Sequence, residues 1–154
     1  MKISYLADHK ELIPTLAGWF FKEWSYLYPE RTRDDFLRLI GERTNKTRLP
    51  LTLVALDSES VIGTISLKMH DMNTRQNLTP WLASLYVSEN LRGKGLGAKL
   101  VDALEKKAQE LKIEKLYLYT PGQENFYSNL GWQVKERTKY RGHPVAIMEK
   151  NIVL

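Results

Sequence analysis

The segment that most constrains the fold spans residues 81–100 and reads WLASLYVSENLRGKGLGAKL. WLASLYV predicts a strand, and leucines at helical spacing predict a helix that runs to about residue 112. The basic loop between them, at 88–97, contains Gly93, Gly95 and Gly97. Glycine lets backbone N–H groups approach an anion closely, and a helix N-terminus adds free N–H donors. The segment therefore predicts a strand–loop–helix unit that binds a phosphate or pyrophosphate.

Two common phosphate-binding motifs do not fit this loop. A Walker A loop requires a Gly-Lys-Ser/Thr sequence that is missing here, and the dinucleotide fingerprint requires a wider last gap between its glycines. The pattern that fits is Arg-x-x-Gly-x-Gly, at Arg92, Gly95 and Gly97. A plain strand-to-helix turn is the alternative. Three glycines so close to a helix start would, however, lower its stability unless the backbone needed their special conformations or a close approach to a ligand.

The rest of the chain predicts a mixed sheet with helices. The expected elements outside this unit are a strand at 3–6, helices at 9–24 and 32–43, a hairpin of strands at 51–56 and 61–69, a strand at 116–120, a short helix at 124–130 and strands at 132–140 and 145–153. Asp8, Thr32 and Thr120 are expected helix caps, Thr120 through a capping box with Gln123, and Pro14 is expected to begin or kink the first helix. Hairpins beside a strand–helix–strand unit indicate an α/β or α+β fold, which we expect to be a single domain over residues 1–154.

Composition narrows the classes of function. The chain has no cysteine, which excludes disulfides, thiolate metal sites and a cysteine nucleophile, and we assign no metal site. An apolar signal-peptide core and a membrane-spanning run are both missing, so a cytoplasmic protein with no membrane partner is expected. The net charge of +5 favours anionic partners. Acidic residues interrupt the basic clusters, which favours a mildly basic solvated surface over a nucleic-acid-binding face, and a polyphosphate cofactor also suits this charge.

Two segments resemble the GNAT superfamily of acetyltransferases. RGKGLG at 92–97 matches the Arg/Gln-x-x-Gly-x-Gly/Ala pyrophosphate loop of that family, and LYV at 85–87 matches the strand before it. FYSNLGW at 126–132 resembles the second family signature: aromatic, Tyr, a few residues, Gly, aromatic. The order of elements also matches, so the resemblance covers nearly the whole chain. It implies a GNAT-like fold, with a central, mostly antiparallel, twisted sheet flanked by about four helices.

The resemblance also implies an activity. GNAT enzymes transfer an acetyl group from acetyl-CoA to a primary amine, which attacks the thioester directly without an acyl-enzyme. The implied cofactor-binding residues are Leu85, Tyr86 and Val87 along the pantetheine arm, and Arg92, Gly93, Lys94, Gly95, Leu96 and Gly97 around the pyrophosphate. The acceptor would be a small-molecule amine or a protein amine, and the protein a monomer or homodimer.

By the same resemblance, Tyr127 matches the general-acid tyrosine of the family, which protonates the leaving thiolate. Some relatives carry a glutamate base where this chain has Trp81. His70 and Asp71, after the preceding strand, are then the candidate bases, either directly or through water, and Asp71 could instead bind a cationic amine. The alternatives are that Tyr127 is a packed core residue and that His70 and Asp71 are solvated loop residues.

The acceptor site is expected between the first two helices and the last hairpin. The aromatic run at 19–28 lies in this region, and part of it must be core at helical spacing. Tyr140, Arg141 and His143 in the last hairpin turn could face the acceptor, and Ser84 could hold a water.

Two rival readings remain open. A GNAT fold could bind acyl-CoA with little turnover, as a sensor or a partner-binding module, and its cofactor binding would not depend on Tyr127. A basic nucleic-acid-binding domain would need clustered cations and exposed aromatics on one face, and the sequence shows no such pattern.

Overall fold

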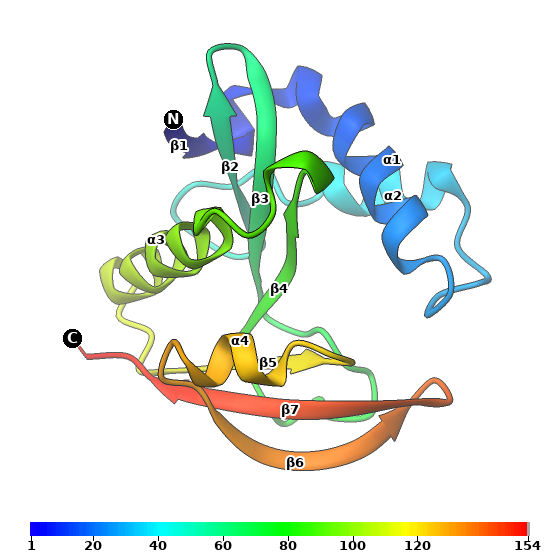
Figure 1. The fold of residues 1–154 in the computed structure, drawn as a ribbon, viewed down its shortest axis with the longest axis vertical. Coiled ribbons are helices and arrows are strands. Elements are labelled where there is room, and N and C mark those ends of the chain that lie inside the picture. Colours follow the sequence, from blue (N-terminus) through cyan, green and yellow to red (C-terminus); the bar gives the residue numbers. More distant parts are fainter. Residues whose placement is uncertain (154) are drawn as a thin grey trace.

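The structure, a computed structural model, describes residues 1–153 and forms a seven-stranded sheet with four α-helices in this part of the chain (Figure 1). The elements are β1 Lys2–Tyr5, α1 Ile13–Trp24, α2 Arg33–Gly41, β2 Leu51–Asp57, β3 Ser60–Lys68, β4 Trp81–Val87, α3 Leu96–Glu110, β5 Lys115–Thr120, α4 Glu124–Ser128, β6 Gln133–Tyr140 and β7 His143–Asn151, with short 3-10 turns at Leu6–Asp8, Lys10–Leu12 and Glu89–Leu91. The strand order is β1-β2-β3-β4-β5-β7-β6. Only β4 and β5 are parallel among the neighbouring strands of residues 1–153. The expected mixed α/β fold with a mostly antiparallel sheet is confirmed.

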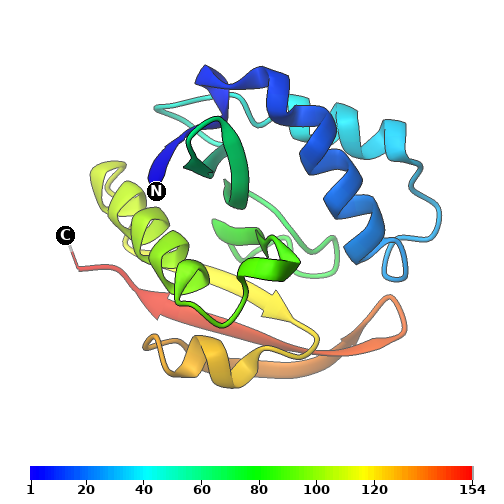
Figure 2. The ribbon, with the colours of Figure 1, turned by 45° about the horizontal axis from the view of Figure 1, so that its top comes forward.

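The helices cover both faces of the sheet. Figure 2 shows α3 on one side of the N-terminal strands and α1 and α2 on the other. The alternation of β2 explains this arrangement, because Leu53 and Ala55 pack in one cluster with α3 while Val54 and Leu56 pack in another with α1 and α2. Two hydrophobic clusters therefore hold the sheet between its helices, and a third lies between the segment after α1 and the C-terminal strands.

The start of α1 differs from the expectation. Asp8 does not cap it, because Asp8 ends one 3-10 turn, a second turn at Lys10–Leu12 follows, and α1 begins at Ile13 with Pro14 in its first turn. Proline has no N–H to donate to the preceding turn and has a φ suited to a helix start, so the helix begins there. Asp8 instead pairs with Lys46.

The start of α4 also differs from the expectation. Thr120 Oγ1 accepts the Gln123 N–H at 2.9 Å, but this bond closes a turn at the end of β5, and α4 begins at Glu124 without a side-chain cap. Thr32 does cap α2: its hydroxyl accepts from the Asp35 N–H, and Asp35 accepts from the Thr32 N–H at 2.8 Å. Gly131 has φ +92° directly after the turn that ends α4, as expected for a left-handed position.

The parallel strands β4 and β5 separate soon after they meet. They are in register only at Trp81 and Tyr117, with one further bond from the Tyr117 N–H to the Pro80 carbonyl at 3.1 Å. Beyond this point β4 runs away from β5, as Figure 1 shows. A bulge at Ser84, which has φ +56°, shifts the pairing of β4 with β3 in the same stretch. The far half of β4 therefore has an edge without a strand partner, and we call this gap the β4–β5 opening.

Candidate functional site

Two cavities occupy the β4–β5 opening. The first, of about 580 Å³, lies against the loop before α3, and we call it the loop cavity. The second, of about 360 Å³, is lined by aromatic residues after α1 and by β4 and β5, and we call it the aromatic cavity. Both cavities are lined by Glu23, Leu85, Gln123 and Tyr127, so they meet at these residues.

The loop cavity gathers most of the predicted cofactor residues. Those that line it are Leu85, Tyr86, Val87, Arg92, Gly93, Gly95, Leu96 and Gly97. Lys94 is exposed and lies outside this lining. The strand–loop–helix unit therefore lines most of one side of the cavity, and Lys94 is the one predicted cofactor residue outside the lining.

The loop backbone is shaped for an anion. Gly93 has φ +77° and Gly95 has φ +86°, a left-handed conformation that side chains with a Cβ adopt at a cost. Gly95 is the N-terminal cap residue of α3, which has no side-chain cap, and the first intrahelical bond runs from Lys99 to the Gly95 carbonyl at 3.2 Å. The N–H groups of the first turn are therefore free for a ligand. Gly97 lies inside this turn, where a Cβ would come within 3.3 Å of Phe126.

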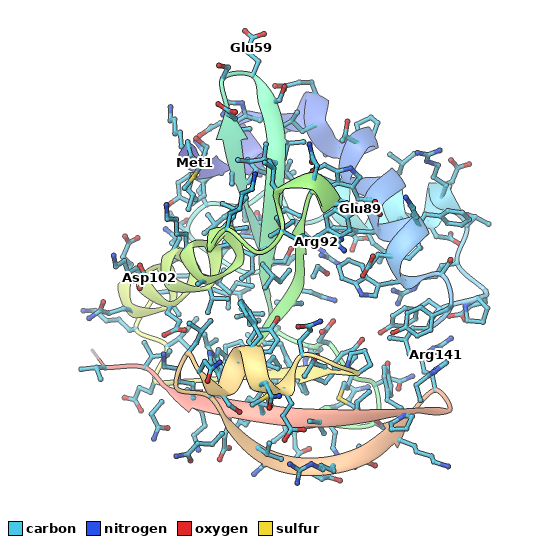
Figure 3. The ribbon with its side chains drawn as sticks, viewed as in Figure 1. Met1, Glu59, Glu89, Arg92, Asp102 and Arg141 are labelled. Carbon is cyan, nitrogen blue, oxygen red and sulfur yellow. The ribbon has the colours of Figure 1, made fainter. Side chains whose placement is uncertain are left out.

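Arg92, which Figure 3 labels, lines the loop cavity and is held there by two contacts. Its Nε donates to the Val87 carbonyl at 2.9 Å, and its guanidinium lies 5.1 Å from the Tyr86 ring centre. Glu23, at the end of α1, lies 3.9 Å from the same guanidinium. Both side chains of this ion pair are largely exposed, so it orients the groups more than it stabilises the fold.

Tyr127 stands where the two cavities meet. It is 7% exposed, packs against Phe126 and Trp132, and its hydroxyl makes no hydrogen bond within residues 1–153. Burial raises the pKa of the Tyr127 phenol well above its ordinary value. The phenol therefore keeps its proton at neutral pH, and Tyr127 belongs to the lining of both cavities.

The aromatic cavity holds a polar group of side chains. The hydroxyls of Tyr28 and Tyr119 are 2.7 Å apart, and burial is the main cause that raises the pKa of both. Lys68 donates to Asp71 Oδ1 at 3.0 Å. Burial lowers the pKa of Lys68, although the neighbouring Asp71 carboxylate opposes this.

Arg43 is the most buried charge of this cavity, with 7% of its surface exposed. Its Nη1 donates to the hydroxyls of Ser66 and Ser84, both at 3.1 Å. Burial lowers the pKa of the guanidinium, and the charge of Asp71 acts in the opposite direction. An arginine nevertheless remains protonated in proteins, so the cavity contains a fixed positive charge.

The structure separates the two candidate bases. Asp71 lines the aromatic cavity, whereas His70 is exposed and lines neither cavity. Ser84 lines the aromatic cavity but is engaged by Arg43. Of the candidate bases His70 and Asp71, only Asp71 is placed to act on a ligand in the aromatic cavity.

The aromatic run divides as expected between wall and core. Phe20, Trp24, Tyr26 and Tyr28 line the aromatic cavity, while Trp19 stacks on Tyr86 at 4.8 Å. The last hairpin supports this wall from outside. Its residues contact the segment after α1: Tyr140 packs on Tyr28, His143 on Tyr26, and Arg141 Nε donates to the Leu27 carbonyl at 2.7 Å (Figure 3).

Four charged residues that line the aromatic cavity were not recognised as site residues from the sequence: Glu23, Arg31, Arg43 and Lys68. Three of them lie in stretches where charges are interspersed and indicate only a solvated surface. Lys68 offered a signal, because it ends a strand in step with the buried positions Thr64 and Ser66.

The fold thus has two joined cavities, one against a glycine-rich loop at a helix N-terminus and one with an aromatic wall. The chain belongs to the acetyltransferase (GNAT) family, whose model matches residues 13–132. The expected family and the expected acyltransferase class are thereby confirmed.

Solved structures share the whole fold. An aminoglycoside 6'-N-acetyltransferase complexed with coenzyme A matches with a TM-score of 0.80 and 19% identity, over 100% of this chain and 98% of that one. The aminoglycoside 6'-N-acetyltransferase from Enterococcus faecium matches with a TM-score of 0.77 and 19% identity, over 100% of this chain and 98% of that one. A ribosomal-protein-alanine N-acetyltransferase from Brucella melitensis also matches with a TM-score of 0.77 and 19% identity, over 98% of this chain and 99% of that one. At this identity the likeness concerns the fold alone.

The described residues lack the features of two other classes of protein, those with a membrane-spanning helix and those with a metal site. None of the helices within residues 1–153 is long and apolar enough to cross a bilayer. The same residues contain no group of three or more His, Asp or Glu side chains that could hold a metal ion.

Proposed function

We propose that the chain is an N-acetyltransferase in which a primary amine attacks the thioester of acetyl-CoA directly. The observation that carries the proposal is the meeting of the loop cavity and the aromatic cavity at Leu85 and Tyr127. Such a junction lets two ligands approach each other from opposite sides. Acetyl-CoA would supply the activated acetyl group, and the chain would position both reactants and move the protons. We further propose that residues 1–154 form one catalytic domain.

The loop cavity fits the cofactor. The uncapped first turn of α3 and the left-handed Gly93 and Gly95 offer N–H groups to a pyrophosphate, and the positive end of the helix dipole adds to them. The unpaired edge of β4 between Leu85 and Val87 offers backbone groups to the amide-containing pantetheine arm. Lys94 is then free to meet phosphate groups that project from the cavity.

The proposed chemistry needs two proton transfers. The amine nitrogen forms a bond to the acetyl carbon, the carbon–sulfur bond breaks, and the amine proton is lost. Tyr127 donates its phenolic proton to the leaving sulfur, a role supported by its place in the lining of both cavities. Asp71, fixed by Lys68, receives the amine proton directly or through water. Glu23, at the shared edge of both cavities, is the second carboxylate within reach.

A small-molecule amine is the acceptor that the aromatic cavity supports best. The cavity of about 360 Å³ is walled by α1, β4, β5 and the segment that the last hairpin supports. This size suits a compact ligand, since small-molecule sites are concave and of a few hundred Å³. The amine of a protein chain, as the name of the Brucella relative indicates for that enzyme, would need a longer and more open groove.

Release of free thiol from acetyl-CoA tests the proposed function. The protein is incubated with acetyl-CoA and a panel of amino acids, aminoalkyl phosphates, polyamines and amino sugars, with thiol detection and mass analysis of the product. At least one amine is expected to release thiol in step with a product heavier by one acetyl group. Tight binding of acetyl-CoA without release for any amine would favour the sensor reading over the enzyme.

A further inference from the structure

Positive charge dominates the inner part of the aromatic cavity. Its lining contains three cations, Arg31, Arg43 and Lys68, and two carboxylates, Glu23 and Asp71. Glu23 is exposed at the edge shared with the loop cavity and faces Arg92. Asp71 is paired with Lys68. Within residues 1–153 neither Arg31 nor Arg43 makes an ion pair with a carboxylate, although the charge of Asp71 acts on Arg43 from within the cavity.

Arg43 has unused donors. A guanidinium carries five N–H groups, and only Nη1 of Arg43 has acceptors within residues 1–153, namely the hydroxyls of Ser66 and Ser84. Neutral hydroxyls do not offset a charge that is taken out of water. A buried arginine that lacks a carboxylate and lines a cavity is a site awaiting an anion, since buried charges are normally paired.

Arg31 lies at the same cavity and is held by aromatic rings. Its guanidinium carbon is 3.8 Å from the Tyr28 ring centre and 5.9 Å from that of Phe36. Within residues 1–153 it makes no ion pair or side-chain hydrogen bond, so stacking fixes its plane and leaves its N–H groups available.

We propose that the acceptor amine carries an anionic group, a carboxylate or a phosphate, which binds Arg43 and Arg31 in the aromatic cavity. This inference rests on the proposed function and names the substrate class of the same site. Guanidinium groups suit both anions, because their planar fork makes paired hydrogen bonds to two oxygens.

The position of the anion site also limits the acceptor. Ser84, which Arg43 contacts, directly precedes Leu85, one of the residues shared by both cavities. An anion at Arg43 therefore lies close to the junction where the amine must react. Compact acceptors, with the amine and the anion a few bonds apart as in an amino acid or an aminoalkyl phosphate, fit this arrangement, and polyamines do not.

A structural role for Arg43 is the competing explanation. Arg43 connects β3 and β4 through Ser66 and Ser84, and Thr52 extends this chain at 2.7 Å from Ser66. Glutamine at position 43 retains donors for these hydroxyls but removes the charge. Arg43→Gln therefore separates the two roles, and Arg43→Lys keeps the charge without the fork.

The test measures binding in pairs of amines that differ only in the anion. Saturation-transfer NMR titrations, in the presence of coenzyme A, compare L-amino acids with their C-terminal amides and O-phosphoethanolamine with ethanolamine. The acidic member of at least one pair is expected to bind more than tenfold tighter than its neutral partner. Arg43→Gln should weaken the acid roughly 10- to 100-fold and leave the neutral partner unchanged. The amino acid and phosphate arms tell the two anion sources apart.

Three further variants complete the test. Arg31→Gln should weaken the acid as well, which keeps the proposal falsifiable if Arg43→Gln does not fold. Arg38→Gln, at an exposed position of α2, is the matched control and should bind as the wild type does. Arg43→Lys should retain part of the preference.

The proposal is overturned if neutral partners or spermidine bind as well as the acids, if no member of any pair binds, or if Arg43→Gln and Arg31→Gln both keep the acid preference. These readouts do not depend on turnover. Failure of thiol release would remove the proposed function, yet an acid preference that requires Arg43 would still establish the anion site.

Discussion

Tyr127 links the chemistry to the fold at the scale of one residue. Its ring is core, since it packs between Phe126 and Trp132, while its hydroxyl has no protein partner in the part of the chain that the structure describes. The two readings of this tyrosine, general acid and packed core, are therefore compatible. A substitution that keeps the ring tests the hydroxyl alone.

Tyr127→Phe is expected to lower kcat about 100-fold or more, because a positioned general acid contributes roughly 10²–10⁴. The affinity for acetyl-CoA should stay within a factor of about two, since the ring that packs in the core is retained. Thiol-release kinetics and a calorimetric titration measure the two quantities. Unchanged turnover would remove Tyr127 from the mechanism.

The pH dependence follows from the same burial. Because burial raises the pKa of Tyr127 above the ordinary value of about 10, the phenol stays protonated where an exposed tyrosine ionises. The kcat profile should therefore show no alkaline decline from this group up to about pH 10. An alkaline limb near pH 8 that Tyr127→Phe abolishes would contradict the assignment.

The same shift has a consequence for stability. Above pH 10 the unfolded chain loses phenolic protons that folded Tyr127, Tyr28 and Tyr119 retain. The unfolded state then binds fewer protons than the native state, so the free energy of unfolding falls as pH rises through this range. Below pH 10 these groups make no such contribution.

At the scale of elements, sequence patterns predicted correctly those strands and helices whose structure depends mainly on residues nearby in the chain. The hairpin of β2 and β3 was predicted from alternation, and Thr32 was predicted as the cap of α2, although the reciprocal bond to Asp35 that completes a capping box there was not. Asp8 and Thr120 failed as helix caps, since Pro14 decided where α1 begins and Thr120 closed a turn ahead of α4. In both cases a neighbouring proline or turn competed with a cap that local spacing allowed.

Thr32→Ala should lower the free energy of unfolding by about 1 kcal/mol, the usual cost of losing an N-cap hydroxyl. Urea unfolding followed by circular dichroism measures the change. Thr47→Ala, at an exposed loop position, serves as the control and should be neutral within about 0.5 kcal/mol. An equal loss in both variants would show that the capping box is not responsible.

At the scale of the whole molecule, the site depends on contacts that no local pattern reveals. The sequence predicted the main wall of the loop cavity because the residues of that wall lie almost consecutively between Leu85 and Gly97. The aromatic wall of the second cavity was expected from the run at 19–28, but most of the charged lining was not, because the cavity brings together side chains from α1, β3, β4 and β5 and from the loops after α2 and β3. Arg43 reads as a helix-end charge in the sequence, and only the approach of β3 and β4 buries it. The divergence of β4 from β5 creates both cavities, and no sequence pattern marks it. In the structure it is accompanied by the bulge at Ser84.

A calorimetric titration with acetyl-CoA tests the central claim most directly, using wild type, Gly95→Val and the control Gly41→Ala. Gly95 has φ +86°, which valine adopts only with strain, whereas Gly41 has no positive φ and no atom within 4 Å of the place that an alanine Cβ would take. We expect micromolar binding that is retained in Gly41→Ala and lost in Gly95→Val. Wild-type protein that does not bind acetyl-CoA, or equal affinity in Gly95→Val, would contradict the account.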